Sequence, residues 1–570
     1  MRGAESAARL LTRLLERRSD LPPAETRDVG AETVEVPMPD GVALEATHYY
    51  PRDLDDRPTV LVRSPYPRTV MGLIGRLIAE RGFHVLFQSC RGTFGSEGEL
   101  VPFENERADG LATIEWLDDQ PWFTGELGTT GMSYLGYTQW AVADHPAIDA
   151  MSTQATASNF ERVTWPGGAF ALGTALRWSA MMADPQSRLR FFGRSAGIGA
   201  DVEAGFETLP LVEADRTTVG EPIDHWRRNF GDADRRREID HSDRVADAAP
   251  THHVGGWYDI ALPPLLDDYR RQVDAGAEPY LTIGPWGHMD PGLNGACIDQ
   301  SIRWLRAHLL GDDGALREDP VRLFVQGSSA SGEKTGASTS DDTGARAGEW
   351  RTFESWPPNG VDADTRFLGS EGRLGVEPPA KAGVDEYRYD PSDPTPSVGG
   401  ATFDEEAGQA DQTDLEARDD VLTYTTEPLS DALTAIGPVT AELFVESSRK
   451  CADVYACLCD VDPAGTSLNV CDGIRRVSFG EEDVGTDGDH SEAVDGDGIR
   501  RVEVDLWPTA YRFGRGHRLR VQIASGAFPR FDRNPGRADP PGESATLLPA
   551  DQRVHRGSDR PSRVALPTLE

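Results

Sequence analysis

Residues 127–137, LGTTGMSYLGY, constrain the fold more than any other part of the chain. Small and β-prone residues lead to Gly131, Ser133 follows at a turn, and Gly136 would let the next helix pack closely on a sheet. This composition predicts a strand, a sharp turn and a helix, with the serine in a strained conformation. The Gly-x-Ser-x-x-Gly spacing is one residue longer than the usual nucleophile elbow. The stretch alone therefore fits either an elbow or a glycine-rich turn with an incidental serine.

Two later segments place polar residues just after predicted apolar strands. Residues 254–259 end in Asp259, and residues 281–288 end in His288. Serine, acid and histidine in this chain order, each at the C-terminal end of a strand, are typical of an α/β-hydrolase triad. We therefore interpret Ser133 as the nucleophile, Asp259 as the acid and His288 as the base.

Strands and helices alternate around the elbow. We predict a β-hairpin over 32–50, buried strands over 59–63, 83–88 and 149–155, and helices over 70–81 and 104–119. The glycine-rich segment 90–98 lacks the Lys-Ser/Thr ending of a phosphate loop. The alternation predicts a parallel, doubly wound sheet that binds ligands at the C-terminal ends of its strands.

Residues 158–244 carry no strand signal and are rich in aromatic side chains. Because this segment interrupts the sheet on its C-terminal side, we expect a helical cap over the active site. Most of its aromatics should form the cap's own core, and a minority should face the substrate. The sheet resumes at 250–254, where His252 and His253 would point to opposite faces and serve structural roles.

A different pattern follows the helix predicted over 302–310. Short alternating strands continue to the C-terminus and predict a β-sandwich or jelly roll. The expected organisation is an α/β-hydrolase domain (1–157 and 245–315), a cap (158–244) and a jelly-roll domain (316–570). Residues 328–348 and the acidic segment 481–497 are predicted loops. The acidic segment does not meet the spacing of a calcium loop, and we interpret it as a solvated face. We predict no metal site and no cofactor.

Charge narrows the classes of partner. The 570 residues carry 95 acidic and 57 basic residues, a formal net charge of −38. Such a surface repels phosphate backbones and anionic lipid, which argues against nucleic-acid and membrane partners. It favours a halophilic source, because high salt screens the self-repulsion.

The N-terminus indicates the cellular location. Leucines and arginines over 9–18 predict an amphipathic helix without the apolar core or cleavage site of a signal peptide. No run of about 18 apolar residues predicts a membrane span. The expected location is therefore the cytoplasm, and a homodimer stays open.

The chain has six cysteines, too few for a disulfide scaffold of this length. Cys451, Cys457 and Cys459 share one parity in a strand-like run and would point to one face. We interpret them as buried structural thiols rather than metal ligands, because no second ligand pair lies nearby.

Six motifs together resemble the cocaine esterase-like and X-Pro dipeptidyl-peptidase-like serine hydrolases (the CocE/NonD group). They are SPY (64–66), CRG with SEG (90–92 and 96–98), GMSYLG (131–136), GGWYD (255–259), GPWGH (284–288) and FPRFDRNP (528–535). The resemblance covers nearly the whole chain. It also accounts for the elbow spacing, because that group uses Gly-x-Ser-Tyr-x-Gly.

The resemblance implies roles that agree with the residue chemistry. Ser133 attacks an acyl carbonyl, His288 transfers the proton, and Asp259 orients the imidazole. The oxyanion would be held by the backbone N–H of Tyr134 and the hydroxyl of Tyr66, which the residues alone indicate only as part of a turn. The expected substrate is a small ester or amide, or a short peptide. The alternatives are an X-Pro dipeptidyl-peptidase and a non-catalytic binding protein with a vestigial hydrolase domain.

Overall fold

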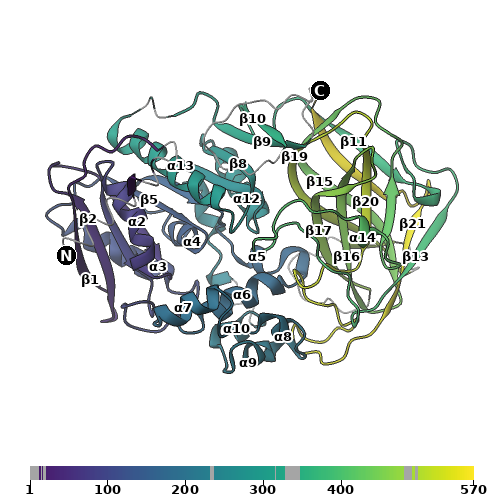
Figure 1. Ribbon diagram of the computed structural model, residues 1–570, viewed down its shortest axis with the longest axis horizontal. Helices are drawn as coiled ribbons and strands as arrows, with labels where there is room; N and C mark the ends of the chain where they lie inside the picture. Colours follow the sequence, from purple (N-terminus) through teal and green to yellow (C-terminus); the bar gives the residue numbers. More distant parts are fainter. Residues whose placement is uncertain are drawn as a thin grey trace.

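The computed structural model describes residues 12, 13, 16, 21–231, 237–312, 314, 316–327, 347–479, 491–494 and 498–569. Its α/β part contains the N-terminus and lies at one end of the molecule (Figure 1). A β-rich part, coloured green to yellow, lies at the other end, and a group of short helices runs along one side. The predicted fold class, an α/β-hydrolase followed by a C-terminal β domain, is confirmed.

The α/β part is built on one twisted sheet. Its strands are β1 (Val29–Pro37), β2 (Ala43–Pro51), β3 (Thr59–Ser64), β4 (His84–Ser89), β5 (Leu127–Met132), β6 (Ile148–Gln154), β7 (Thr251–Tyr258), β8 (Tyr280–Gly287) and β9 (Val321–Gly327). They pair in the order β1-β2-β4-β3-β5-β6-β7-β8-β9. The pairings from β4 to β9 are parallel, so the C-terminal ends of these strands meet at one edge.

Helices cover both faces of the parallel strands. They are α2 (Arg68–Ala79), α3 (Glu106–Asp118), α4 (Tyr134–Trp140), α12 (Leu262–Asp274) and α13 (Pro291–Leu310). All six residues of β3 and of β4 are buried, which explains their near-continuous apolar runs. Helix α13 begins well before the predicted start near residue 302. Asp290 caps it by accepting from the N–H of Gly292 at 2.8 Å, and Pro291 suits the first helical position.

The segment between β6 and β7 is helical, as predicted. It contains α5 (Glu161–Thr164), α6 (Leu172–Met182), α7 (Arg188–Ser195), α8 (Val202–Phe206), α9 (Ala214–Val219) and α10 (Asp224–Arg228). Phe170, Leu176, Phe206 and Trp226 form part of a buried cluster within these helices. Phe170, Phe206 and Trp226, with Trp165 and Phe230 packed against them, serve the cap's own core, whereas Phe192 is exposed. Which cap aromatics face the substrate stays a prediction.

The regular secondary structure of the C-terminal part is almost entirely β-strand. They are β10 (Gly348–Phe353), β11 (Val361–Leu368), β12 (Leu374–Gly375), β13 (Gly383–Tyr389), β14 (Leu422–Thr425), β15 (Leu433–Ser447), β16 (Cys451–Val461), β17 (Ser467–Ser478), β18 (Ser491–Val494), β19 (Ile499–Phe513), β20 (Arg518–Ala524), β21 (Ala550–Arg556) and β22 (Arg563–Leu569). The sheet β14-β20-β16-β17 faces one that includes β15, β19, β21 and β22. A large apolar cluster fills the space between them.

The two parts share a continuous sheet. Strand β9 pairs in parallel with β8 on one side, and it also pairs with β10 and with two residues of β19. The strand predicted to open the jelly-roll domain is therefore bonded to both parts. The domain boundary at residue 316 stays a prediction.

Some sequence predictions need correction or lie outside the described residues. The acidic segment 481–497 is not a loop throughout, because residues 491–494 form β18 against β19. Most of segment 9–18, predicted as a helix, and most of segment 328–348, predicted as a loop, lie outside the described residues. Among the described residues, we find no helix with both the length and the apolar composition of a membrane span. The halophilic source and the cytoplasmic location stay predictions.

The cysteine and histidine predictions agree with the structure. All six cysteines are buried and free, and the sulfurs of Cys457 and Cys459 are 3.7 Å apart. His252 contacts the hydroxyl of Thr282, while His253 contacts the side chain of Gln272. Burial lowers the pKa of both imidazoles, as expected for neutral structural histidines.

Candidate active site

Ser133 occupies the sharp turn between β5 and α4. Its backbone angles, φ 60° and ψ −124°, lie in a strained region, as the elbow hypothesis requires. A Cβ at Gly131 would lie 2.4 Å from the Cβ of Leu135, and one at Gly136 would lie 2.4 Å from a methyl carbon of Thr156. Both positions therefore need glycine for close approach of the helix to the sheet.

The structure brings the three predicted triad residues together. The Nε2 of His288 is 3.0 Å from the Oγ of Ser133, and its Nδ1 is 2.8 Å from a carboxylate oxygen of Asp259. The other carboxylate oxygen of Asp259 accepts from the backbone N–H of Ala261 at 2.7 Å. Asp259 and His288 are almost fully buried. With Nδ1–H donated to the carboxylate, Nε2 is free to accept the serine proton.

The β-rich part also reaches the histidine. The ring of Phe403 lies 5.3 Å from the imidazole of His288, measured between centroids. A Cβ at Gly287 would lie 2.4 Å from the Cβ of Ala407, so the segment around Phe403 packs directly on the end of β8. Sequence reasoning missed this contribution, because the segment has no periodicity and lies far from the triad along the chain.

Tyr66 follows β3 and lies at the same edge of the sheet. Its hydroxyl oxygen accepts a hydrogen bond from the indole N–H of Trp178 at 3.1 Å. Burial raises the pKa of Tyr66 to about 12, against the opposing effect of hydrogen bonds with Trp178 and Ser133. The phenol is therefore neutral at ordinary pH and can donate its proton.

Tyr134 is the first residue of α4. Its backbone N–H is one of the four at a helix start that have no acceptor within the helix. Tyr66 follows β3, and Tyr134 follows Ser133 after β5, the strand that pairs in parallel with β3. The family resemblance implies that both act as oxyanion donors, and this role stays a prediction.

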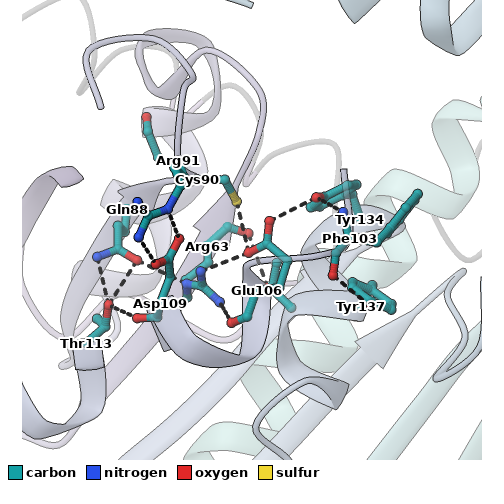
Figure 2. Close-up of polar contacts among 12 residues, drawn as sticks. Arg63, Gln88, Cys90, Arg91, Phe103, Glu106, Asp109, Thr113, Tyr134 and Tyr137 are labelled. Atoms are coloured by element: carbon teal, nitrogen blue, oxygen red, sulfur yellow. Dashed lines mark hydrogen bonds and ion pairs between the residues drawn. The ribbon is translucent and has the colours of Figure 1, made fainter. Parts of the chain in front are cut away.

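A buried polar network lies behind the Tyr134 side chain (Figure 2). The Tyr134 hydroxyl donates to a carboxylate oxygen of Glu106 at 2.9 Å and accepts from the N–H of Phe103 at 2.8 Å. Glu106 forms an ion pair with Arg63 at 2.8 Å, and Arg63 also donates to the Glu106 carbonyl at 2.6 Å. The Cys90 thiol completes the set, 3.5 Å from the Glu106 carboxylate. A single carboxylate thus links β3, the loop after β4, α3 and α4.

The electrostatics of this network keep the Tyr134 hydroxyl and the Cys90 thiol protonated beside the Glu106–Arg63 ion pair. Burial, and then the negative charge of Glu106, raise the pKa of Tyr134 and of Cys90 well above their ordinary values. Both groups therefore keep their protons and can donate them to the carboxylate. Sequence reasoning missed the network, although an arginine inside the apolar run 59–64 was a signal that a buried partner must exist.

The CRG motif has a structural role beside this network. The guanidinium of Arg91 makes a bidentate pair with Asp109, at 3.1 and 2.6 Å (Figure 2). Asp109 lies on α3, the helix that also carries Glu106. The pair anchors the glycine-rich loop to the helix.

Within the described residues, no group of three or more His, Cys, Asp or Glu side chains is arranged to hold a metal ion.

Comparison with protein families matches both parts of the chain. A model described as X-Pro dipeptidyl-peptidase (S15 family) matches residues 40–290. One described as X-Pro dipeptidyl-peptidase C-terminal non-catalytic domain matches residues 314–565. The cocaine esterase of Rhodococcus sp. (strain MB1 Bresler) is 31% identical over 597 residues, covering 95% of this chain and 98% of the relative.

Two solved structures with a similar fold cover nearly the whole chain. An aminopeptidase from the marine sediment archaeon Thaumarchaeota archaeon has a TM-score of 0.78 and 23% identity, covering 97% of this chain and 99% of its own. An α-amino acid ester hydrolase has a TM-score of 0.75 and 22% identity, covering 96% and 98%. These two bear on the fold alone.

The fold and the family matches define a serine hydrolase. The alignment with cocaine esterase over nearly the full length of both chains identifies the family within the serine hydrolases. The chain belongs to the cocaine esterase-like (CocE/NonD) family of serine hydrolases.

Proposed function

We propose that the chain cleaves acyl esters through an acyl-enzyme on Ser133. The observation that carries the proposal is the line of contacts from Ser133 Oγ to His288, 3.0 Å, and from His288 to Asp259, 2.8 Å. This geometry lets the serine lose its proton to Nε2 while Asp259 stabilises the imidazolium that results. The match to a cocaine esterase over nearly the whole chain supports an ester as substrate.

The reaction proceeds in two stages, acylation of Ser133 and hydrolysis of the acyl-enzyme. Ser133 Oγ bonds to the acyl carbon as His288 takes its proton, and the carbonyl oxygen becomes an oxyanion near the Tyr134 N–H and the Tyr66 hydroxyl. His288 then protonates the leaving alcohol as its bond to the acyl carbon breaks. Water attacks the acyl-enzyme with His288 as base, which releases the acid and restores Ser133. Each oxyanion donor is worth about 3 kcal/mol in the barrier.

Hydrolysis of matched chromogenic substrates tests this proposal. We expect turnover of p-nitrophenyl acetate and butyrate in molar salt, loss of that turnover in Ser133→Ala, and little cleavage of Gly-Pro-p-nitroanilide. Strong, Ser133-dependent cleavage of the anilide would replace the esterase with an X-Pro dipeptidyl-peptidase. Retained ester hydrolysis in a folded Ser133→Ala variant would contradict the assignment of the nucleophile.

A further inference from the structure

One contact of Tyr66 comes from the cap. Trp178 lies on α6, and its indole N–H meets the Tyr66 hydroxyl oxygen at 3.1 Å, across 112 positions of the chain. An indole N–H can only donate, so the phenol oxygen must be the acceptor in this bond. The hydroxyl has a single proton, which must therefore point away from Trp178. Besides Trp178, the Ser133 side chain also lies within hydrogen-bonding reach of this hydroxyl.

The indole is held in place from several sides. Its plane lies within 6° of the Tyr134 ring, with centroids 6.1 Å apart, and within 23° of the Phe103 ring at 6.2 Å. The His225 ring lies with its centroid 5.5 Å from that of the indole and its plane at 69° to it. Trp178 thus bonds to the residue that supplies one oxyanion donor and stacks on the residue that supplies the other.

We propose that Trp178 is a positioning residue that directs the Tyr66 hydroxyl proton toward the oxyanion. By occupying the acceptor side of the oxygen, the indole leaves the proton only the orientation that serves catalysis. A donated hydrogen bond also polarises the phenol and makes it a stronger donor. The oxyanion hole is therefore complete only when the cap is docked on the sheet. This inference rests on the proposed function, in which Tyr66 is an oxyanion donor.

The rival role for Trp178 is that of a pocket wall that contacts bound substrate. The two roles predict different kinetics, because a group that acts only on the transition state changes kcat, whereas uniform substrate binding changes KM. Replacing Trp178 with phenylalanine keeps an aromatic ring against Tyr134 and Phe103 and removes the N–H. Trp165→Phe is the matched control, since Trp165 is a cap tryptophan that packs on Phe170 and Phe230 instead.

The test is a double-mutant cycle measured with p-nitrophenyl butyrate. We expect Trp178→Phe to lower kcat about tenfold, the effect of one neutral hydrogen bond, with KM almost unchanged. Tyr66→Phe should lower kcat about 100-fold. In the Tyr66→Phe background, Trp178→Phe should have no further effect on kcat. Trp165→Phe should leave kcat at the wild-type value.

The outcomes separate this inference from the function on which it rests. Equal kcat losses from Trp178→Phe in both backgrounds, or a change in KM alone, would overturn the role of Trp178 while ester hydrolysis still depends on Ser133. Retained hydrolysis in Ser133→Ala would overturn the proposed function itself. If Trp178→Phe does not fold, replacement of Trp178 with 3-benzothienylalanine keeps the bicyclic ring without the N–H. The same tenfold loss is expected for that variant, and full activity would overturn the inference.

Discussion

The two halves of the candidate active site are held in contrasting ways. Behind Ser133, the side chain of Tyr134 reaches a buried ion pair between Glu106 and Arg63, so charge and hydrogen bonds fix the start of α4. Around His288, the supports are one buried carboxylate, backbone groups, and an aromatic ring from the β-rich part. Ser133 is thus anchored by charges that take no part in the proposed reaction, whereas His288 is anchored by a carboxylate that does.

This difference indicates which substitutions should lower stability and which should lower activity. Removing one member of a buried ion pair leaves an uncompensated charge, which destabilises the fold. Removing the charge beside a catalytic histidine mainly changes its tautomer and the stability of its protonated form. The following predictions break or sharpen this comparison, from the largest expected effect to the smallest.

The Asp259→Asn substitution should abolish most activity and leave the fold intact. The amide cannot hold His288 with Nε2 unprotonated, nor stabilise the imidazolium, so kcat should fall on the order of 10⁴-fold, or about 5 kcal/mol. Steady-state hydrolysis of p-nitrophenyl butyrate measures the loss, and urea unfolding checks stability. A loss of less than tenfold would mean that the carboxylate does not act on the histidine.

The Arg63→Met substitution should have the opposite profile. It leaves Glu106 charged and unpaired in the core, which should lower the free energy of unfolding by about 3–5 kcal/mol. Arg388→Met is the matched control, because Arg388 pairs with Asp551 on the surface, where the cost should stay below about 1 kcal/mol. Urea unfolding compares the two. Equal effects would show that the nucleophile half does not depend on its buried charges.

The buried His253 should make the stability of the fold depend on pH. Burial lowers the pKa of His253 to about 4, below its unfolded value near 6.5. The unfolded chain therefore binds more protons between these values, so stability is complete above pH 6.5 and falls as the pH drops toward 4. The full contribution is on the order of 3 kcal/mol. Unfolding of wild type and His253→Gln at pH 7 and 4.5 should show a smaller loss in the variant, and parallel losses would contradict the assignment.

The order of Ser133, Asp259 and His288 along the chain predicts a triad, and the structure places these three side chains within hydrogen-bond distance of one another. Local composition around Ser133 predicts the strained turn, and apolar strands predict where Asp259 and His288 emerge. These signals are local, because a few neighbouring residues determine where a strand ends and where a turn needs glycine. The parallel sheet then brings the strand ends together without further information.

The supports of the site could not be predicted, because they depend on tertiary contacts. The Arg63–Glu106 pair joins a strand to a helix 43 positions away, and neither segment contains a sequence signal that identifies its partner. The Trp178–Tyr66 bond and the Phe403–His288 contact cross between parts of the chain whose relative placement has no local signature. Short edge strands such as β18 escape detection for the same reason, since pairing with β19 rather than propensity defines them.

The most direct test of the central claim is labelling with a fluorophosphonate probe, followed by peptide mass spectrometry. A fluorophosphonate reacts with a serine that a neighbouring base activates, so it reports the Ser133–His288–Asp259 arrangement without assuming a substrate. We predict one labelled site, Ser133, with labelling lost in Ser133→Ala and strongly slowed in Asp259→Asn. A label on another serine, or labelling that persists in a folded Ser133→Ala variant, would contradict the account.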